Sequence, residues 1–131
     1  VPNMIIYDSL DHMLPSQKQE SFRLDVKRCY TDAKRQSELR NIPVVSTTHA
    51  KASAKGTKVR QESFSEAYDK VRLSDVVLTI SQSQEQEDDN EAEIFIDKNR
   101  DEASNIGVLV KLMFKVMSIR VLNKIDNKAE E

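Results

Sequence analysis

The spacing of hydrophobic residues predicts a strand, a helix and a second strand in the first part of the chain. Residues 4–7 form an apolar run that ends at Asp8, and residues 42–48 form a second run that turns polar at Thr47 and Thr48. Between the two runs, apolar residues recur at the spacing of one helix face. These residues are Phe22, Val26, Cys29, Tyr30 and Ala33. A strand, a helix and a strand in this order favour two parallel strands with a right-handed crossover.

The limits of this helix are predicted from residues that commonly flank helices. Ser16 and Gln19 have the spacing of a capping box, which predicts a helix start near Ser16. Asn41 and Pro43 predict its end. The charged residues on the other faces of the helix are interpreted as a solvated surface.

The middle of the chain predicts a short helix followed by a hairpin. Residues 62–73 predict the helix, and residues 76–80 have the composition of a buried strand. The acidic stretch 84–93 predicts an exposed hairpin tip, and residues 94–98 predict the returning strand.

The last part of the chain has a mixed pattern. Residues 108–122 contain many β-branched residues, and we predict two short strands or one bent strand there. Residues 123–131 are polar, and we predict a frayed tail.

Size and composition restrict the possible classes of protein. A chain of 131 residues has the size of one domain, and its 20 basic and 22 acidic residues argue neither for nor against nucleic acid. Cys29 is the only cysteine, which excludes an internal disulfide and a multi-cysteine zinc site and fits a reducing compartment. No apolar run approaches the ~20 residues that cross a bilayer, and no signal peptide is visible. We therefore expect a cytoplasmic protein.

The glycine content excludes one common nucleotide-binding motif. Gly56 and Gly107 are the only glycines, so the G-x-x-x-x-G-K-[ST] phosphate loop does not occur in these residues. If the chain belongs to an ATPase, we expect its phosphate-cradling part to precede residue 1. We therefore interpret the chain as a fragment.

Asp8 and His49 follow the two predicted parallel strands, so both are expected at one edge of the sheet, where ligands of such sheets bind. An aspartate at the end of a buried strand is how many ATPases hold the water shell of a nucleotide-bound Mg²⁺. The alternative is that Asp8 simply ends a strand. A neutral imidazole at position 49 can donate to a γ-phosphate oxygen, and the alternative is a loop histidine without a ligand.

Lys98 ends the predicted strand, and Arg100 follows two residues later; in a strand, side chains at this spacing point to one side. Two such cations suit the charge that develops on a transferring phosphate, which is the role of an arginine finger. The alternative is an ion pair with a neighbouring acid. The neighbouring acids in the sequence are Asp97, Asp101 and Glu102.

Residues 50–61 are basic and contain no acid, which suits contacts to a nucleic-acid backbone. The cations are Lys51, Lys55, Lys58 and Arg60. No aromatic residue lies between them, so base stacking is not predicted. The alternative is an ordinary surface loop that carries lysines.

Four segments in order resemble a known family. They are M-I-I-Y-D-S-L-D (4–11), I-P-V-V-S-T-T-H (42–49), S-D-V-V-L-T-I (74–80) and I-F-I-D-K-N-R (94–100). Together they are similar to the later half of the C-terminal RecA-like motor domain of DnaB-type replicative helicases, over about residues 2 to 121. The resemblance implies an α/β fold, a partial P-loop NTPase core in which parallel strands with a crossover helix precede antiparallel strands. It assigns residues 1–122 to the motor domain and leaves residues 123–131 as the polar tail.

The resemblance also implies roles for individual residues in a complete protein that uses ATP and Mg²⁺. Asp8 would be the Walker B aspartate that holds Mg²⁺ through water, and His49 the γ-phosphate sensor, as in some phage members. Lys98 and Arg100 would reach the nucleotide of a neighbouring subunit in a ring, expected to be a hexamer. The basic loop at 50–61 would face single-stranded DNA in the central channel.

The sequence departs from the family in two respects. Asp101 and Glu102 follow the Lys-x-Arg element, where the family usually has glycine. The Walker A motif and the catalytic glutamate do not occur in these 131 residues. We therefore expect the chain by itself to hold neither ATP nor Mg²⁺ and not to hydrolyse ATP.

Two other interpretations remain open from the sequence. A RecA-like recombinase or a circadian-clock-type ATPase shares the Asp8-Ser9 pattern followed by an apolar residue. A non-catalytic α/β binding module without a phosphate loop is the second alternative.

Overall fold

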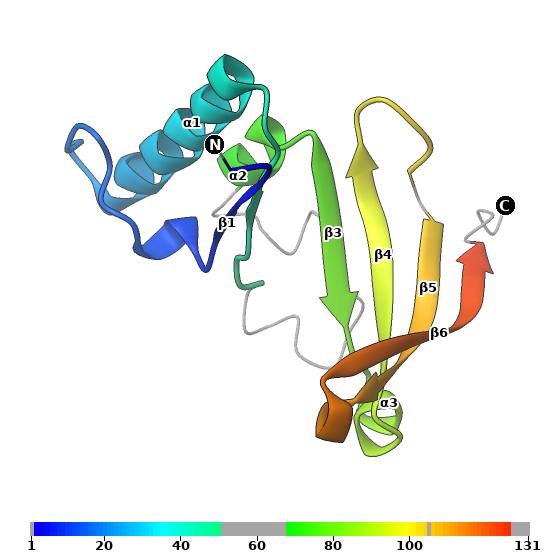
Figure 1. Cartoon of the computed structure of the whole chain (residues 1–131). Coiled ribbons are helices and arrows are strands. Elements are labelled where there is room, and N and C mark those ends of the chain that lie inside the picture. Colours follow the sequence, from blue (N-terminus) through cyan, green and yellow to red (C-terminus); the bar gives the residue numbers. More distant parts are fainter. Residues whose placement is uncertain (1, 51–67, 105, 127–131) are drawn as a thin grey trace, which may run out of the picture. The chain divides into compact units, whose positions relative to one another are not determined.

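The computed structural model describes residues 2–50, 68–104 and 106–126 (Figure 1). The chain divides into two compact units, which are described separately. Unit 1 comprises Val1–His49 and Glu66–Ser74, and unit 2 comprises Ala50–Ser65 and Asp75–Glu131. The described strands form two separate sheets, one in each unit.

Unit 1 contains the predicted strand–helix–strand arrangement. Strand β1 (Ile5–Tyr7) pairs in parallel with β2 (Val44–Ser46), and α1 (Phe22–Arg40) connects them. A short 3-10 helix, η1 (Leu10–His12), directly follows β1, and α2 (Tyr68–Leu73) completes the unit. The predicted parallel pair is confirmed.

The start of α1 differs from the prediction. The helix begins at Phe22 with Ser21 as N-cap, whose hydroxyl accepts from the Leu24 N–H at 3.4 Å. The predicted capping box at Ser16 is wrong, because the Ser16 hydroxyl instead donates to the Asp32 carboxylate. The predicted end is confirmed, since Asn41 is the C-cap in the left-handed conformation (φ 52°, ψ 47°).

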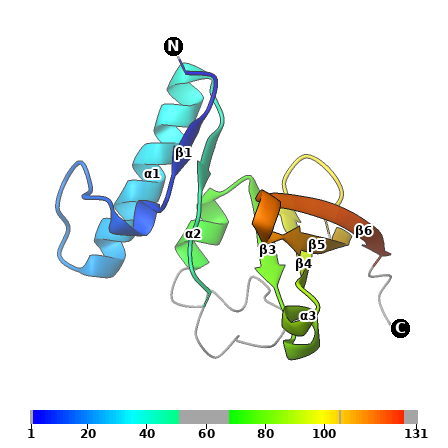
Figure 2. The same ribbon diagram turned by 60° about the horizontal axis from the view of Figure 1, so that its bottom comes forward.

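The core of unit 1 lies between α1 and the parallel strands. Figure 2 shows α1 running alongside β1 and β2. Four residues of the predicted helix face are buried, namely Val26, Cys29, Tyr30 and Ala33. The fifth, Phe22, is the first residue of α1 and is exposed, so the prediction is wrong there. Leu10 from η1 forms one buried cluster with Val26, Tyr30 and Ala33, and Tyr7, Val44 and Leu73 pack against it.

Unit 2 contains an antiparallel sheet in the order β3-β4-β5-β6. Its strands are β3 (Val76–Ser81), β4 (Glu91–Asn99), β5 (Ile106–Met113) and β6 (Ser118–Asp126). A 3-10 helix, η4 (Phe114–Val116), joins β5 to β6, so the prediction of two strands in this part is confirmed.

Strand β6 continues past the boundary that we placed at residue 122. Asn123 pairs with Leu109 and Lys124 pairs with Val108, and the strand ends at Asp126. The prediction of a frayed tail from residue 123 is therefore wrong for residues 123–126. Ladder hydrogen bonds use backbone groups, so a polar side chain does not prevent a residue from pairing.

The acidic stretch between β3 and β4 forms more structure than a hairpin tip. It contains α3 (Gln84–Asp88), and Ser83 and Gln86 form a complete capping box at its start. The antiparallel β3–β4 hairpin is confirmed. Glu93, however, lies within β4 and is only 4% exposed, so an exposed tip is wrong at this position.

In β3, apolar side chains are exposed and polar side chains are buried, which is the reverse of what we expected. Leu78 and Ile80 are 59% and 65% exposed, whereas Thr79 and Ser81 are buried. The buried face continues across the sheet to Phe95, opposite Gly107, where a Cβ would lie 3.0 Å from the Phe95 ring. Strand 76–80 is confirmed, but the expected burial of its apolar side chains is wrong.

Candidate functional site

The carboxyl ends of β1 and β2 meet at one edge of the parallel pair in unit 1. Tyr7 is paired with Ser46, so Asp8 and Thr47 follow side by side. The Thr47 hydroxyl donates to Asp8 Oδ1 at 2.5 Å, and the Thr47 N–H donates to the Tyr7 carbonyl oxygen at 3.2 Å. His49 follows two residues later and is exposed. This edge therefore presents a carboxylate, a hydroxyl and an imidazole from two neighbouring strand ends.

The donors at this edge suit a hydrated magnesium ion. Mg²⁺ prefers oxygen ligands and usually keeps several waters while it contacts one or two carboxylates and substrate phosphates. Asp8 and Thr47 supply such oxygens at the surface. Within residues 2–50, 68–104 and 106–126, no group of three or more histidine, cysteine or acidic side chains could enclose a metal ion. The residues fit an ion held through water together with a nucleotide, and not an all-protein metal cage.

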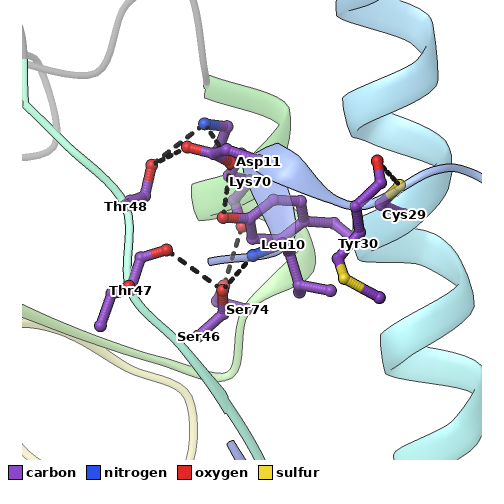
Figure 3. Close-up of polar contacts among 10 residues, drawn as sticks. Leu10, Asp11, Cys29, Tyr30, Ser46, Thr47, Thr48, Lys70 and Ser74 are labelled. Atoms are coloured by element: carbon purple, nitrogen blue, oxygen red, sulfur yellow. Dashed lines mark hydrogen bonds and ion pairs between the residues drawn. The ribbon is translucent and has the colours of Figure 1, made fainter. Parts of the chain in front are cut away.

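Immediately behind this edge, three polar side chains converge on the Asp11 carboxylate (Figure 3). Lys70 Nζ lies 2.7 Å from Asp11 Oδ1, and the Tyr30 hydroxyl donates to the same oxygen at 3.0 Å. The Thr48 hydroxyl donates to Asp11 Oδ2 at 2.7 Å and accepts from Lys70 Nζ at 3.0 Å. We call Asp11, Tyr30, Thr48 and Lys70 the Asp11 cluster. It joins η1, α1, the chain that follows β2, and α2.

The electrostatics of the Asp11 cluster favour an ionised Asp11. Burial by itself raises the pKa of Asp11, but the hydrogen bonds from Lys70 and Thr48 and the charge of Lys70 outweigh it, so the pKa lies below its ordinary value. Burial, together with the negative charge of Asp11, raises the pKa of Tyr30 to about 12. Tyr30 is therefore a neutral hydrogen-bond donor at physiological pH. The Lys70 ammonium also lies 5.5 Å from the centre of the Tyr30 ring.

Sequence reasoning did not identify the Asp11 cluster. Its contacting pairs are between 19 and 59 positions apart, so no local pattern shows them. The only signal was the pair of threonines, Thr47 and Thr48, at the polar end of the second predicted strand. Thr47 contacts Asp8 and Thr48 contacts Asp11, so consecutive hydroxyls serve two different carboxylates.

The predicted cationic pair lies in unit 2. Arg100 follows β4, and its Nη1 is 2.9 Å from Asp75 Oδ1, while its backbone N–H donates to the Asp75 carbonyl oxygen at 3.0 Å. The Arg100 side chain is still 57% exposed. Lys98 is half-buried within β4, opposite Val77. The acid that Arg100 contacts, Asp75, was not among the neighbours considered from the sequence.

The cations predicted to contact nucleic acid, Lys51, Lys55, Lys58 and Arg60, lie outside the described residues. In the part of the chain that the structure describes, no helix has the length and apolar character that a bilayer span requires.

The lowered pKa of Asp11 predicts a pH-dependent contribution to stability. Its folded pKa lies below its unfolded value of ~3.9, so the stabilisation is present above that value and is lost as the pH falls through the folded pKa. Asp11→Asn should lower the free energy of unfolding by about 1–3 kcal/mol at pH 7 and by much less at about pH 3. Urea unfolding of both proteins at the two pH values measures this. The exposed Glu38→Gln is the control, and an equal loss at both pH values would contradict the prediction.

Comparison with known proteins identifies the fold. No protein-family model and no curated protein sequence matches the chain. A solved structure described as an ATPase domain superposes with a TM-score of 0.81 at 15% identity, covering 92% of this chain and 44% of that chain. A DnaB-like replicative helicase, described together with its interactions with primase, superposes with a TM-score of 0.80 at 13% identity, covering 92% of this chain and 30% of that one. The chain thus spans less than half of either structure. It has the mixed α/β fold of part of the ATPase domain of DnaB-like helicases, as the sequence resemblance implied.

Proposed function

We propose that this chain is part of the motor domain of an ATP-driven replicative DNA helicase. The observation that carries the proposal is that a chain with the fold of helicase ATPase domains brings Asp8 and a hydroxyl together at the edge of its parallel strands. In open α/β sheets this edge is where ligands bind. A complete protein of this kind would act in the cytoplasm as a ring of identical subunits, hydrolysing ATP between them and moving on single-stranded DNA.

In this proposal, Asp8 holds a nucleotide-bound Mg²⁺ through water, and His49 contacts the γ-phosphate. The metal would neutralise charge on the phosphates when bound. The Thr47 hydroxyl supports this role of Asp8, because its 2.5 Å hydrogen bond to Oδ1 fixes the carboxylate while the other oxygen, Oδ2, is left for water.

We further propose that Lys98 and Arg100 act on the nucleotide of a neighbouring subunit. An arginine finger must extend from the surface, and the exposed Arg100 side chain meets this requirement. Its ion pair with Asp75 is also exposed, and such pairs contribute at most about 1 kcal/mol. A developing phosphate charge can therefore compete with Asp75 for the guanidinium group.

Exposed apolar side chains on the parallel strands support a role within a larger domain. Parallel sheets are normally covered on both faces. In unit 1, α1 and η1 supply the buried cluster on one face, whereas Ile6 on the other face is 67% exposed and Val45 is also exposed. In a larger motor domain of the proposed kind, further elements would pack over these residues and cover the second face of the parallel pair.

Replacement of Asp8 tests the magnesium role. In the complete protein, Asp8→Asn should lower Mg²⁺-dependent ATP turnover about 10- to 100-fold, because an amide orients metal-bound water less well than a carboxylate does. A steady-state ATPase assay across a Mg²⁺ titration measures this. Glu20→Gln, which changes an exposed acid before α1, is the matched control. Turnover equal to that of the wild type would remove Asp8 from the proposed site.

Replacement of Arg100 separates a catalytic role from a structural one. Arg100→Ala should lower ATP turnover by about 10³-fold or more while leaving nucleotide affinity largely intact, as expected for an arginine finger. Asp75→Asn removes the ion pair but keeps the guanidinium group. If Asp75→Asn lowers turnover as strongly as Arg100→Ala does, Arg100 acts only through its ion pair. Turnover and binding of a fluorescent nucleotide are measured in parallel.

Charge reversal tests the proposed DNA segment. Replacing Lys51, Lys55 and Lys58 with glutamate should weaken binding of single-stranded DNA and make its affinity less sensitive to salt, because fewer counterions are released. Fluorescence anisotropy with an oligonucleotide at several salt concentrations measures both effects. Reversal of three exposed lysines outside this segment, Lys18, Lys115 and Lys124, is the control for net charge. The proposal fails if the two triple variants bind alike.

A further inference from the structure

The Asp11 cluster connects two points of the chain that flank the proposed DNA-binding segment. Thr48 directly precedes His49, and Lys70 lies in α2. The two residues are 22 positions apart, and Lys70 Nζ donates to Thr48 Oγ1 at 3.0 Å. This contact therefore ties the chain before residues 51–67 to the chain after them.

The same contact reaches the proposed nucleotide edge through Asp11. Thr48 shares the Asp11 carboxylate with Lys70 and Tyr30, and Asp11 lies three residues after Asp8. Thr48 also follows Thr47, whose hydroxyl contacts Asp8. A shift of the β2 end would thus disturb the contacts of both carboxylates at once.

Partial burial makes the Asp11 cluster sensitive to small shifts. The side chains of Lys70 and Asp11 are only 15% and 17% exposed, so water replaces lost contacts poorly. Asp11 Oδ1 binds Lys70 and Tyr30 while Oδ2 binds Thr48. Movement of Thr48 without α2 would leave Asp11 Oδ2 and one Lys70 proton without these partners, which is costly for charged groups.

We propose that Lys70, Asp11 and Thr48 are positioning residues that make the end of β2 and helix α2 move as one body. Through them, the state of the nucleotide edge and the stimulation of ATP turnover by single-stranded DNA depend on each other. This inference rests on the proposed helicase function. The three side chains have no role in the proposed function itself.

A second set of contacts provides a matched control. Lys27 Nζ and Arg23 Nη2 on α1 lie 3.4 and 3.6 Å from the Asp69 carboxylate on α2. These ion pairs also attach α2 to unit 1, yet they involve neither β2 nor Asp11. If attachment of α2 alone matters, loss of Lys27 and loss of Lys70 should have similar effects.

The experiment measures ATP turnover of the complete protein with and without oligo(dT). Lys70→Met and Thr48→Val should each reduce the stimulation of kcat by single-stranded DNA at least about fivefold, with the KM for ATP and unstimulated turnover within about twofold of wild type. Thr48→Ser keeps the hydroxyl and should retain the stimulation, as should Lys27→Met. Circular dichroism checks that each variant folds, and if Lys70→Met does not fold, the Thr48→Val and Thr48→Ser pair decides.

The outcomes separate this inference from the proposed function. A wild-type protein whose turnover does not respond to single-stranded DNA would contradict the helicase function itself. A responsive wild type with unchanged stimulation in Thr48→Val and Lys70→Met would overturn the positioning role alone. Equal losses in Lys70→Met and Lys27→Met, or in Thr48→Val and Thr48→Ser, would also overturn it, because the Asp11 cluster would then act only by holding unit 1 together.

Discussion

The parallel pairing of β1 with β2 determines where every candidate nucleotide contact in unit 1 lies. Parallel strands end at the same edge, so pairing of Tyr7 with Ser46 brings Asp8 next to Thr47 although they are 39 positions apart. The crossover helix α1 makes this pairing stable, because its buried face covers the strands and η1. A single packing arrangement thus creates both the core of the unit and the polar edge that we assign to the nucleotide.

The two aspartates near that edge, Asp8 and Asp11, differ in how far the protein surrounds them. Asp8 is exposed, whereas Asp11, three residues further along, is enclosed by Lys70, Thr48 and Tyr30. A partly buried carboxylate is tolerated only when its oxygens are well satisfied. The exposed carboxylate therefore suits a ligand that comes and goes, and the enclosed one suits a fixed geometry. The two aspartates can serve different purposes because the chain surrounds only one of them.

Local sequence patterns predicted the positions of helices and strands well. They predicted poorly which side chains are buried and which residues those side chains contact. The helix periodicity found the buried face of α1, and Asn41 ended the helix as expected. The pattern Ser-x-x-Gln occurs at both Ser16 and Ser83, yet it forms a capping box only at Ser83. At Ser16, the serine instead contacts Arg28 and Asp32, which are 12 and 16 positions away.

Residue type predicted a buried β3, but it could not show which face of the sheet would be covered. The Asp11 cluster was unpredictable for the same reason, since tertiary packing assembles it from four parts of the chain.

The exposed apolar residues constrain the proposed function independently of the polar edge. In both units, strands direct large aliphatic side chains to the surface, with Ile6 and Val45 on the parallel pair and Leu78 and Ile80 on the antiparallel sheet. Exposed apolar surface on sheets is a liability unless something covers it. A free-standing binding module would be expected to place polar residues there. In the antiparallel sheet, Thr79 and Glu93 are buried beside Phe95, whereas Leu78 and Ile80 of the same sheet are exposed. This arrangement is expected for elements that work inside a larger assembly, which favours the motor-domain proposal over an independent module.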